Sequence, residues 1–224
     1  MNADGKTRII LVDDHPLMRD SIKMHLENQS DIEIVAEASD GEQAVELADK
    51  LRPDLIIMDI SMPRMNGLDA TKKIKEMHPE IAVLVLTVHS DTEHILKILE
   101  AGAAGYLTKD ILGEKLIHAI RMIMSGESVL SEEVMNKVLV HALRYPWKPS
   151  VPALGEKLSP RELEIYRLSA KGMSNKQISQ ELNLNLRTVK GHLVNIFSKL
   201  NASSRTEALL IGLRTGLITF DDIK

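Results

Sequence analysis

The chain contains no cysteine, few aromatic residues and no long hydrophobic run. The absence of cysteine excludes disulfide bonds, thiol catalysis and cysteine-ligated zinc or iron–sulfur sites, and it fits a reducing compartment. The longest apolar runs, such as 81–86, are far shorter than a membrane span. The first ten residues also lack the apolar region of a secretory signal. We therefore expect a soluble, cytoplasmic protein that has no membrane partner.

The distribution of charge along the chain is uneven. At 224 residues the chain is long enough for two modest domains. Residues 158–224 carry ten lysines and arginines against six acidic residues, a net charge of +4. Residues 1–157 carry eighteen against twenty-six, a net charge of −8. This asymmetry suggests two domains with different partners.

Five short apolar runs recur in the first part of the chain, and a segment with helical spacing follows each of them. The runs are 9–12, 32–35, 55–58, 81–86 and 105–107. Apolar runs without alternation are typical of parallel strands that helices cover on both faces. Residues 1–127 are therefore predicted to form an α/β domain with a five-stranded, doubly wound parallel sheet.

Residues 128–157 are predicted to connect this domain to a second one. An amphipathic helix is expected over 131–144, with Ser131 as its N-cap. The segment 145–155 holds three of the eight prolines within seven residues, together with the only tryptophan, Trp147. This composition predicts an extended, semi-rigid linker in which Trp147 is a packing anchor.

The pattern of residues 158–224 is purely helical, and capping residues mark where the helices begin. N-caps are predicted at Ser159, Ser174, Asn185 and Ser204. The first two begin capping boxes, and Pro160 stands at the first helical position after Ser159. Four short helices joined by turns of a few residues predict a small domain of the helix-turn-helix kind.

Polar side chains stand at or just after the ends of four predicted strands. They are Asp13, Asp14, Asp59, Thr87 and Lys109. In a parallel sheet the ligand crevice lies outside the carboxyl ends of the strands, so all five should converge there. A single polar residue at a strand end is usually just solvated, but five polar residues at four strand ends are hard to explain in that way.

Three neighbouring carboxylates repel one another unless a cation compensates their charge. Oxygen ligands suit Mg²⁺, and they would come from Asp13, Asp14, Asp59 and the backbone carbonyl of Ser61. A carboxylate can also attack phosphorus and form an aspartyl phosphate. The Lys109 ammonium and the Thr87 hydroxyl are then suited to bind the phosphoryl oxygens.

The predicted third helix of the C-terminal domain, 186–200, has two different faces. Val189, Leu193, Phe197 and Leu200 recur at helical spacing and are expected to face the core. Residues on or beside the other face are predicted to contact DNA in the major groove: Thr188, Lys190, Gly191, His192, Val194 and Asn195. Phosphate contacts are expected from Asn175, Lys176 and Lys199. A merely solvated face is the plainer alternative, but it would rarely expose a valine and a mid-helix glycine.

The motifs of both parts resemble a known family. Asp13-Asp14, the stretch 58–67 (MDISMPRMNG), Thr87 and the stretch 105–109 (GYLTK) resemble the receiver domain of two-component response regulators. The stretch 158–200 resembles a LuxR-type helix-turn-helix. Together and in this order they resemble the NarL/FixJ subfamily, and the resemblance covers nearly the whole chain.

The resemblance implies a flavodoxin-like receiver at 1–127 and a DNA-binding domain at 158–224. It also implies phosphorylation of Asp59 by a sensor histidine kinase, Mg²⁺ at Asp13, Asp14 and the Ser61 carbonyl, and signalling through Thr87 and Tyr106. The expected protein is a regulator rather than an enzyme. Its expected partners are the kinase, double-stranded DNA and a second copy of the chain on activation, with RNA polymerase as a further candidate.

The fourth helix of the C-terminal domain, 204–214, is the expected dimer surface. Its apolar residues Leu209, Leu210, Ile211 and Leu213 supply more apolar area than one small core needs. Packing onto its own domain is the alternative. Dimer formation would bring two domains to adjacent half-sites on DNA.

Two other functions are compatible with parts of the pattern. A Mg²⁺-dependent phosphatase that proceeds through an aspartyl phosphate would need a second acid and a substrate-binding cap, and neither is visible. Asp54 begins the third strand, at the opposite edge of the sheet, and Asp69 falls on a helix. A receiver joined to a protein-interaction module is the other alternative, but the positive C-terminal charge disfavours it.

Overall fold

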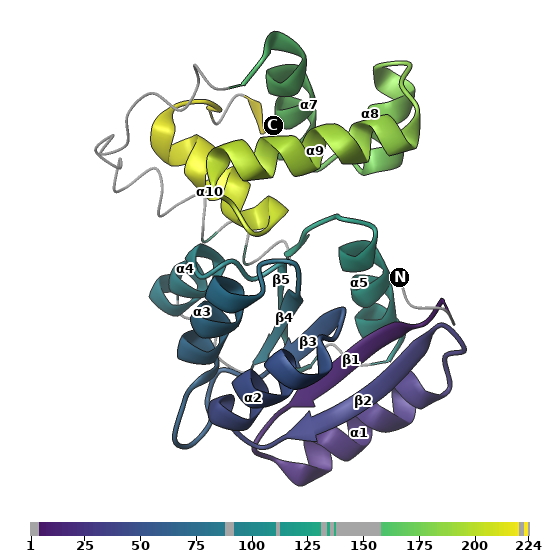
Figure 1. The fold of residues 1–224 in the computed structure, drawn as a ribbon, viewed down its shortest axis with the longest axis vertical. Helices are drawn as coiled ribbons and strands as arrows, with labels where there is room; N and C mark the ends of the chain where they lie inside the picture. The colour runs from purple at the N-terminus through teal and green to yellow at the C-terminus, as the bar shows by residue number, and fades with distance from the viewer. Residues whose placement is uncertain are drawn as a thin grey trace.

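The computed structural model describes residues 5–87, 92–110, 113–130, 134, 137, 158–219 and 222–223. They form an α/β domain with a helical domain stacked on it (Figure 1). The predicted linker helix with Ser131 and the proline-rich linker with Trp147 lie outside the described residues, apart from Val134 and Lys137, which are helical. Within those ranges, no helix is long and apolar enough to cross a membrane.

A parallel sheet forms the centre of the α/β domain, in the order β2-β1-β3-β4-β5-β6. Its strands are β1 (Thr7–Val12), β2 (Ile32–Ala38), β3 (Leu55–Met58), β4 (Ala82–Thr87), β5 (Gly105–Thr108) and β6 (Val129–Leu130). The five predicted strands are all present. The sixth was not predicted, because it has only two residues and is defined by its pairing with β5 rather than by an apolar run.

Helices cover both faces of this sheet. One face carries α2 (Gly41–Leu51), α3 (Gly67–Met77) and α4 (Thr92–Glu100), and the other carries α1 (Pro16–Glu27) and α5 (Glu114–Met124). Neighbouring strand residues such as Ile9 and Ile10 point to opposite faces, and both are 0% exposed. Burial on both faces explains why the strands are apolar without alternation.

The helical domain consists of short helices that begin where the sequence predicts. They are α7 (Pro160–Ala170), α8 (Asn175–Glu181), α9 (Leu186–Leu200) and α10 (Arg205–Thr215). The side chains of Ser159, Ser174, Asn185 and Ser204 each accept a hydrogen bond from a backbone N–H two or three residues later. All four predicted N-caps are therefore confirmed, and the first two complete capping boxes.

The core of the helical domain follows the predicted apolar face of α9 with one change. Val189, Leu193 and Leu200 are buried, whereas Phe197 is only half-buried. Ile196, which was not predicted, is fully buried instead. Phe197 packs against the core of the helical domain and also lines the groove between the two domains.

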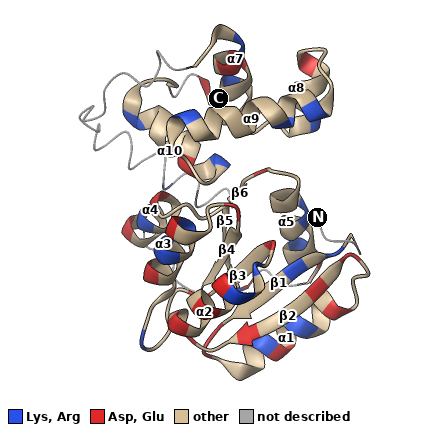
Figure 2. Ribbon diagram, in the orientation of Figure 1, with Lys and Arg blue, Asp and Glu red and all other residues tan. Residues whose placement is uncertain are grey.

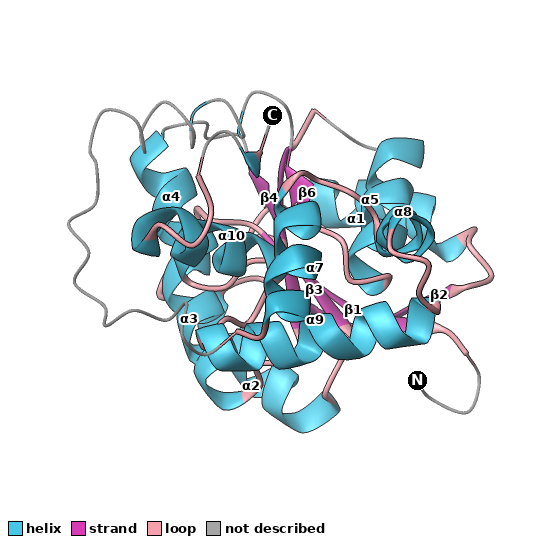
Figure 3. Ribbon diagram, turned by 90° about the horizontal axis from the view of Figure 1, so that it is seen from above, coloured by secondary structure: helices cyan, strands magenta, loops and turns pink. Residues whose placement is uncertain are grey.

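The two domains meet along a surface that we call the domain seam, in which α10 packs on α4 and on the turn before β5 (Figure 1). Ser204 Oγ donates to the Ala103 carbonyl at 3.1 Å, and Thr206 Oγ1 donates to the Ala104 carbonyl at 3.3 Å. Leu210 is 1% exposed and belongs to the core of the α/β domain. Seen from above, α7 and α9 lie over the sheet (Figure 3).

Polar contacts fix the edges of the domain seam. Arg214 of α10 forms an ion pair with Glu100 at the end of α4. Lys75 Nζ donates to the Ser203 carbonyl at 3.4 Å, close to the start of α10. The seam thus uses side chains from both domains, although the sequence predicted none of these pairings.

Candidate functional site

The carboxyl ends of the strands bring four of the predicted polar residues to one edge of the sheet. Asp13 directly follows β1, Asp59 directly follows β3, and Lys109 directly follows β5. The Asp59 N–H donates to the Val12 carbonyl at 2.8 Å, which holds the end of β3 beside the end of β1. Asp14 follows Asp13 at the same edge and is half-exposed. We call Asp13, Asp14, Asp59 and Lys109 the acidic site.

Lys109 is the centre of the acidic site. Its Nζ lies 2.7 Å from Asp13 Oδ2 and 2.8 Å from Asp59 Oδ2. All three residues are less than a tenth exposed, so these ion pairs are shielded from water. The other oxygen of each carboxylate accepts a backbone hydrogen bond, from the His15 N–H at 2.9 Å and the Ile60 N–H at 2.8 Å respectively.

Burial and neighbouring charges shift the pKa values of Asp59 and Lys109 in the acidic site. Burial raises the pKa of Asp59, and repulsion from Asp13 adds to the rise, whereas Lys109 opposes it. Burial alone would lower the pKa of Lys109, but its bonds to Asp13 and Asp59 outweigh that effect and raise it. Lys109 is therefore a firmly held cation between two carboxylates.

The carboxylates could also hold a divalent cation. Ligand atoms of Asp13, Asp14, His15 and Asp59 all lie within 4.8 Å of one another. Carboxylate oxygens are the ligands that Mg²⁺ prefers, so the donor set fits this ion. His15 was not predicted, although it directly follows the acidic pair. Its Nδ1 lies 2.7 Å from Asp14 Oδ1, and the ring is largely exposed.

The loop 59–67 holds Asp59 against the start of α3. The Gly67 N–H donates to the Ile60 carbonyl at 2.9 Å, so the loop closes back on itself. A Cβ at Gly67 would lie 2.0 Å from the Asp59 carbonyl oxygen, closer than any real contact. Gly67 therefore permits the close approach that sets the position of Asp59. Ser61, whose carbonyl was predicted as a ligand, lies exposed in the same loop.

Thr87 and Tyr106 are both fully buried, on the neighbouring strands β4 and β5. Thr87 ends β4, and its carbonyl accepts the Lys109 N–H at 2.9 Å. Tyr106 lies on β5 opposite Val85 and is part of the same core cluster as Leu210 of α10. A continuous packed region therefore leads from the acidic site to the domain seam.

Asp54 and Asp69, the two other acidic residues that were considered, lie where the sequence predicted. Asp54 precedes β3, at the opposite edge of the sheet, and its carboxylate accepts the Arg8 N–H at 2.8 Å. Asp69 is exposed in the first turn of α3 and accepts a hydrogen bond from Asn66. Neither belongs to the acidic site.

The second candidate site is the surface of α9, which we call the recognition surface. Thr188, Lys190, Gly191 and Asn195 are exposed, and Val194 is 67% exposed. His192 is half-buried, and Lys176 on α8 is exposed. Basic residues are visible on α8 and α9 in Figure 2. A Cβ at Gly191 would meet no atom within 4 Å, so the packing of the domain does not require this glycine.

Two predicted phosphate-contact residues have protein partners in this arrangement. Asn175 is 3% exposed, and its Nδ2 donates to the Ser125 carbonyl of the α/β domain at 2.8 Å. Lys199 Nζ lies 2.7 Å from both carboxylate oxygens of Glu162. Their role towards phosphates stays a prediction, and for the buried Asn175 it requires the side chain to leave its present partner.

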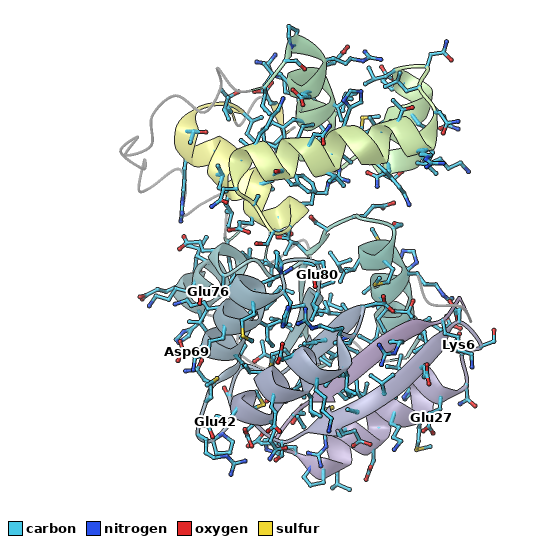
Figure 4. The ribbon with its side chains drawn as sticks, in the orientation of Figure 1. Lys6, Glu27, Glu42, Asp69, Glu76 and Glu80 are labelled. Carbon is cyan, nitrogen blue, oxygen red and sulfur yellow. The ribbon has the colours of Figure 1, made fainter. Side chains whose placement is uncertain are left out.

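The C-terminal half of the recognition surface faces the α/β domain across a groove. Val194, Phe197 and Ser198 line one wall of this groove. Glu76 and Glu80, labelled in Figure 4, lie on the opposite wall. Glu100, Lys72 and Lys75 line the same wall, so a mixed wall of three acidic and two basic residues stands opposite the helix that the sequence assigns to DNA.

Two family matches cover most of the chain. Residues 9–121 match the response regulator receiver domain, and residues 156–211 match the luxR family of bacterial regulatory proteins.

Relatives match over nearly their whole length. The transcriptional regulatory protein LiaR of Bacillus subtilis is 41% identical over 94% of this chain and 99% of its own. The nitrate/nitrite response regulator NarL of Escherichia coli is 40% identical over 93% and 95%. Among solved structures, the response regulator ChrA of a heme-sensing two-component system is 35% identical, with a TM-score of 0.51 over 96% of this chain and 100% of its own.

Proposed function

This chain belongs to the NarL/FixJ-type response regulators, which are transcriptional regulators with a receiver and a LuxR-type DNA-binding domain, and from that membership we propose how it is controlled. A sensor histidine kinase phosphorylates Asp59. The phosphoryl group releases the DNA-binding domain from the domain seam, and two copies then bind adjacent half-sites on double-stranded DNA. The observation that carries the proposal is the position of Lys109 Nζ between Asp13 and Asp59.

The acidic site supplies the groups that phosphoryl transfer to a carboxylate needs. An Asp59 carboxylate oxygen attacks phosphorus while the bond from phosphorus to its donor breaks. Lys109 already contacts Asp59 Oδ2 at 2.8 Å, so it can move its hydrogen bond to a phosphoryl oxygen and balance the new charge. The Ile60 N–H holds the other oxygen of Asp59 and fixes the direction of attack.

Mg²⁺ would be held by the carboxylates of Asp13, Asp14 and Asp59 together with the Ser61 carbonyl. When bound, the ion neutralises the negative charge shared by the carboxylates and the phosphoryl oxygens. Asp13 is kept in place by the His15 N–H and by Lys109, so the protein has one ligand oriented in advance.

Thr87 and Tyr106 are the proposed link to the DNA-binding domain. An aspartyl phosphate carries about −1.5 to −2 charges where the free carboxylate carries −1, so the charge at Asp59 becomes more negative by about 0.5 to 1. The Thr87 hydroxyl can turn towards the phosphoryl oxygens. Tyr106 can then fill the space beside Thr87. Because Tyr106 shares a core cluster with Leu210, this movement changes the packing beneath α10.

Release of the seam would remove the receiver wall that faces the C-terminal half of the recognition surface across the groove. Val194 and Phe197 line one side of the groove, and the receiver wall opposite them blocks access to that part of α9. Glu76 and Glu80 on that wall repel a phosphate backbone, and Lys72 and Lys75 offset part of the repulsion. Asn175 is held by the Ser125 carbonyl while the domains are docked. Opening also exposes Leu210 on α10, the helix expected to form the dimer.

The first test is phosphorylation of the full chain with acetyl phosphate and Mg²⁺, followed by intact mass measurement. One phosphoryl group should be added, and Asp59→Asn should abolish the addition. Asp69→Asn is the matched control because Asp69 is exposed on the neighbouring helix, and it should be phosphorylated like the parent chain. Phosphorylation of Asp59→Asn at the parent rate would overturn the site assignment.

The second measurement is duplex DNA binding by the same proteins. Phosphorylated parent chain should bind more tightly than the unphosphorylated chain, and acetyl phosphate should not change the affinity of Asp59→Asn. Equal affinities of the phosphorylated and unphosphorylated parent chain would contradict control through the domain seam.

A further inference from the structure

A cavity lies inside the domain seam, away from the acidic site. Its volume is about 210 Å³, several times that of one water molecule. Ser128 and Leu130 line it from the receiver, and Arg205 and Leu209 line it from α10. The end of α7 around Ser169 closes another side. The cavity therefore exists only while the two domains are docked.

Arg205 is half-buried and brings a positive charge to this cavity. Its Nη2 donates to the Ser169 carbonyl at 2.7 Å and to the Met173 carbonyl at 2.5 Å, which fixes the guanidinium against the end of α7. Its Nη1 is buried and has no hydrogen-bond partner. Burial lowers the pKa of Arg205 to about 10, and Glu127 opposes this effect only partly.

No carboxylate of the described residues lies within ion-pair distance of Arg205. Glu127 also lines the cavity, but its carboxylate accepts a hydrogen bond from Ser125 Oγ at 3.0 Å. A buried guanidinium without a paired anion is costly, because arginine stays protonated at neutral pH.

The receiver contributes a second unsatisfied group. Ser128 Oγ is buried without a hydrogen-bond partner, and Ser128 lines the same cavity as Arg205. Buried polar atoms are nearly always hydrogen-bonded, so two such atoms in one cavity point to a missing polar occupant. Arg205 is also the first residue of α10, an eleven-residue helix whose N-terminus favours negative charge.

We propose that the cavity binds one small anion, a carboxylate or a phosphate, between the Arg205 guanidinium and the Ser128 hydroxyl. The Arg205 guanidinium donates a hydrogen bond to the anion from the helical domain, and the Ser128 hydroxyl donates one from the receiver. The anion balances the charge of Arg205, which a water molecule cannot do. Leu130 and Leu209 limit the site to a compact ligand.

Because the anion contacts both domains, it stabilises their docked arrangement. A ligand that binds only the docked form stabilises that form. The stabilisation grows with the logarithm of the ratio of the ligand concentration to its Kd. The anion therefore opposes opening of the seam and weakens DNA binding. This consequence rests on the proposed function, whereas binding of the anion does not.

The binding test is calorimetric titration of the full chain with sodium phosphate and, separately, with sodium acetate. Chloride replaces the ligand to keep the ionic strength constant, and Mg²⁺ is left out so that the acidic site does not contribute. We expect saturable binding of one anion per chain. The phosphate and acetate arms decide which of the two anions the site takes.

Two variants place the binding in the cavity. Arg205→Gln retains amide donors for the α7 carbonyls but removes the charge, and it should weaken binding roughly tenfold or more. Ser128→Ala removes only the hydroxyl and is the smaller change, so it tests the same site if Arg205→Gln is unstable. Arg167→Gln, an exposed arginine on α7, is the matched control and should bind like the parent chain.

Absence of saturable binding by both anions overturns the proposal, as does equal binding by the parent chain, Arg205→Gln and Ser128→Ala. The effect of the anion on DNA affinity is measured in a separate titration of the same proteins with DNA. The bound anion should weaken the DNA affinity of the parent chain and leave that of Ser128→Ala unchanged. If the anion binds as expected but no form of the chain binds DNA, the proposed function fails and the anion site stands.

Discussion

The acidic site and the recognition surface are built in opposite ways. In the acidic site, Asp13 and Asp59 are buried and share one lysine, and the ends of the strands fix their positions. On the recognition surface, Lys190 and Asn195 are exposed on one helix. The ion pairs of the first site hold its side chains in place, whereas the side chains of the second are open to solvent on a helix surface. Substitutions should therefore change structure and reactivity in the first and mainly affinity in the second.

Two glycines test this difference, and the larger effect is expected at Gly67. In Gly67→Ala the new Cβ would lie 2.0 Å from the Asp59 carbonyl oxygen, so the loop that carries Asp59 must shift. Overpacking of this kind costs about 1–3 kcal/mol of folding stability. Displacement of a reacting group by about 1 Å can slow a reaction about 100-fold. Denaturant unfolding and the rate of phosphorylation by acetyl phosphate measure both effects, and a parent-like rate would show that the loop does not position Asp59.

Gly191→Ala should have the opposite effect on stability. Its Cβ would meet no atom within 4 Å, and alanine is favoured over glycine within a helix by about 1 kcal/mol. The helical domain should therefore become more stable. DNA binding should weaken, because the added methyl group prevents the close approach of α9 to the duplex. Thermal unfolding and DNA titration separate the two results, and unchanged DNA affinity would remove Gly191 from the recognition surface.

Features fixed by the order of the strands or by local sequence could be predicted, and contacts between the two domains could not. Asp13, Asp59 and Lys109 were predicted together because a parallel sheet brings the carboxyl ends of its strands to one edge. Ser159 and Ser174 were predicted as caps because a capping box is local in sequence. Each of these inferences needs only the secondary structure and its order.

The contacts of the domain seam could not be predicted in this way. Leu210 was expected in a dimer or in its own domain, but it packs into the core of the receiver. Asn175 was expected near a phosphate, but it bonds to the Ser125 carbonyl. Both contacts depend on how two separately folded domains sit together, and no local pattern encodes that placement. The choice between a dimer and a docked domain also rests on small energy differences, since one apolar face can serve both.

Glu162 tests whether an ion pair between a buried carboxylate and an exposed lysine behaves like the buried pairs of the acidic site. Hydrogen bonds from Lys199 and from Ser159 lower its pKa from 4.5 to about 2. A lowered pKa in the folded state adds stability that is present above pH 4.5 and is lost as the pH falls from 4.5 towards 2. Glu162→Gln retains the capping box, as Gln177 does at α8, but loses the charge.

The stability difference between the parent chain and Glu162→Gln should be about 1 kcal/mol at neutral pH, since Lys199 is partly exposed and solvent screens the pair. The difference should shrink towards zero at pH 2. Denaturant midpoints across this pH range measure it, and Glu164→Gln, an exposed glutamate on the same helix, is the control. A difference that stays constant with pH would mean that the cap, rather than the charge, supplies the stability.

The smallest expected effect comes from the edge of the domain seam. Glu100 of α4 forms an ion pair with Arg214 of α10, and both side chains are about a third exposed. Pairs of this kind contribute about 0–1 kcal/mol, so Glu100→Gln should raise the DNA affinity of the unphosphorylated chain by at most about fivefold. Glu93→Gln on the same helix removes a charge that pairs with Lys97 within α4, and it should leave the affinity unchanged. If both variants bind DNA like the parent chain while phosphorylation still raises affinity, this pair does not contribute to docking, and the control lies in the packing around Leu210.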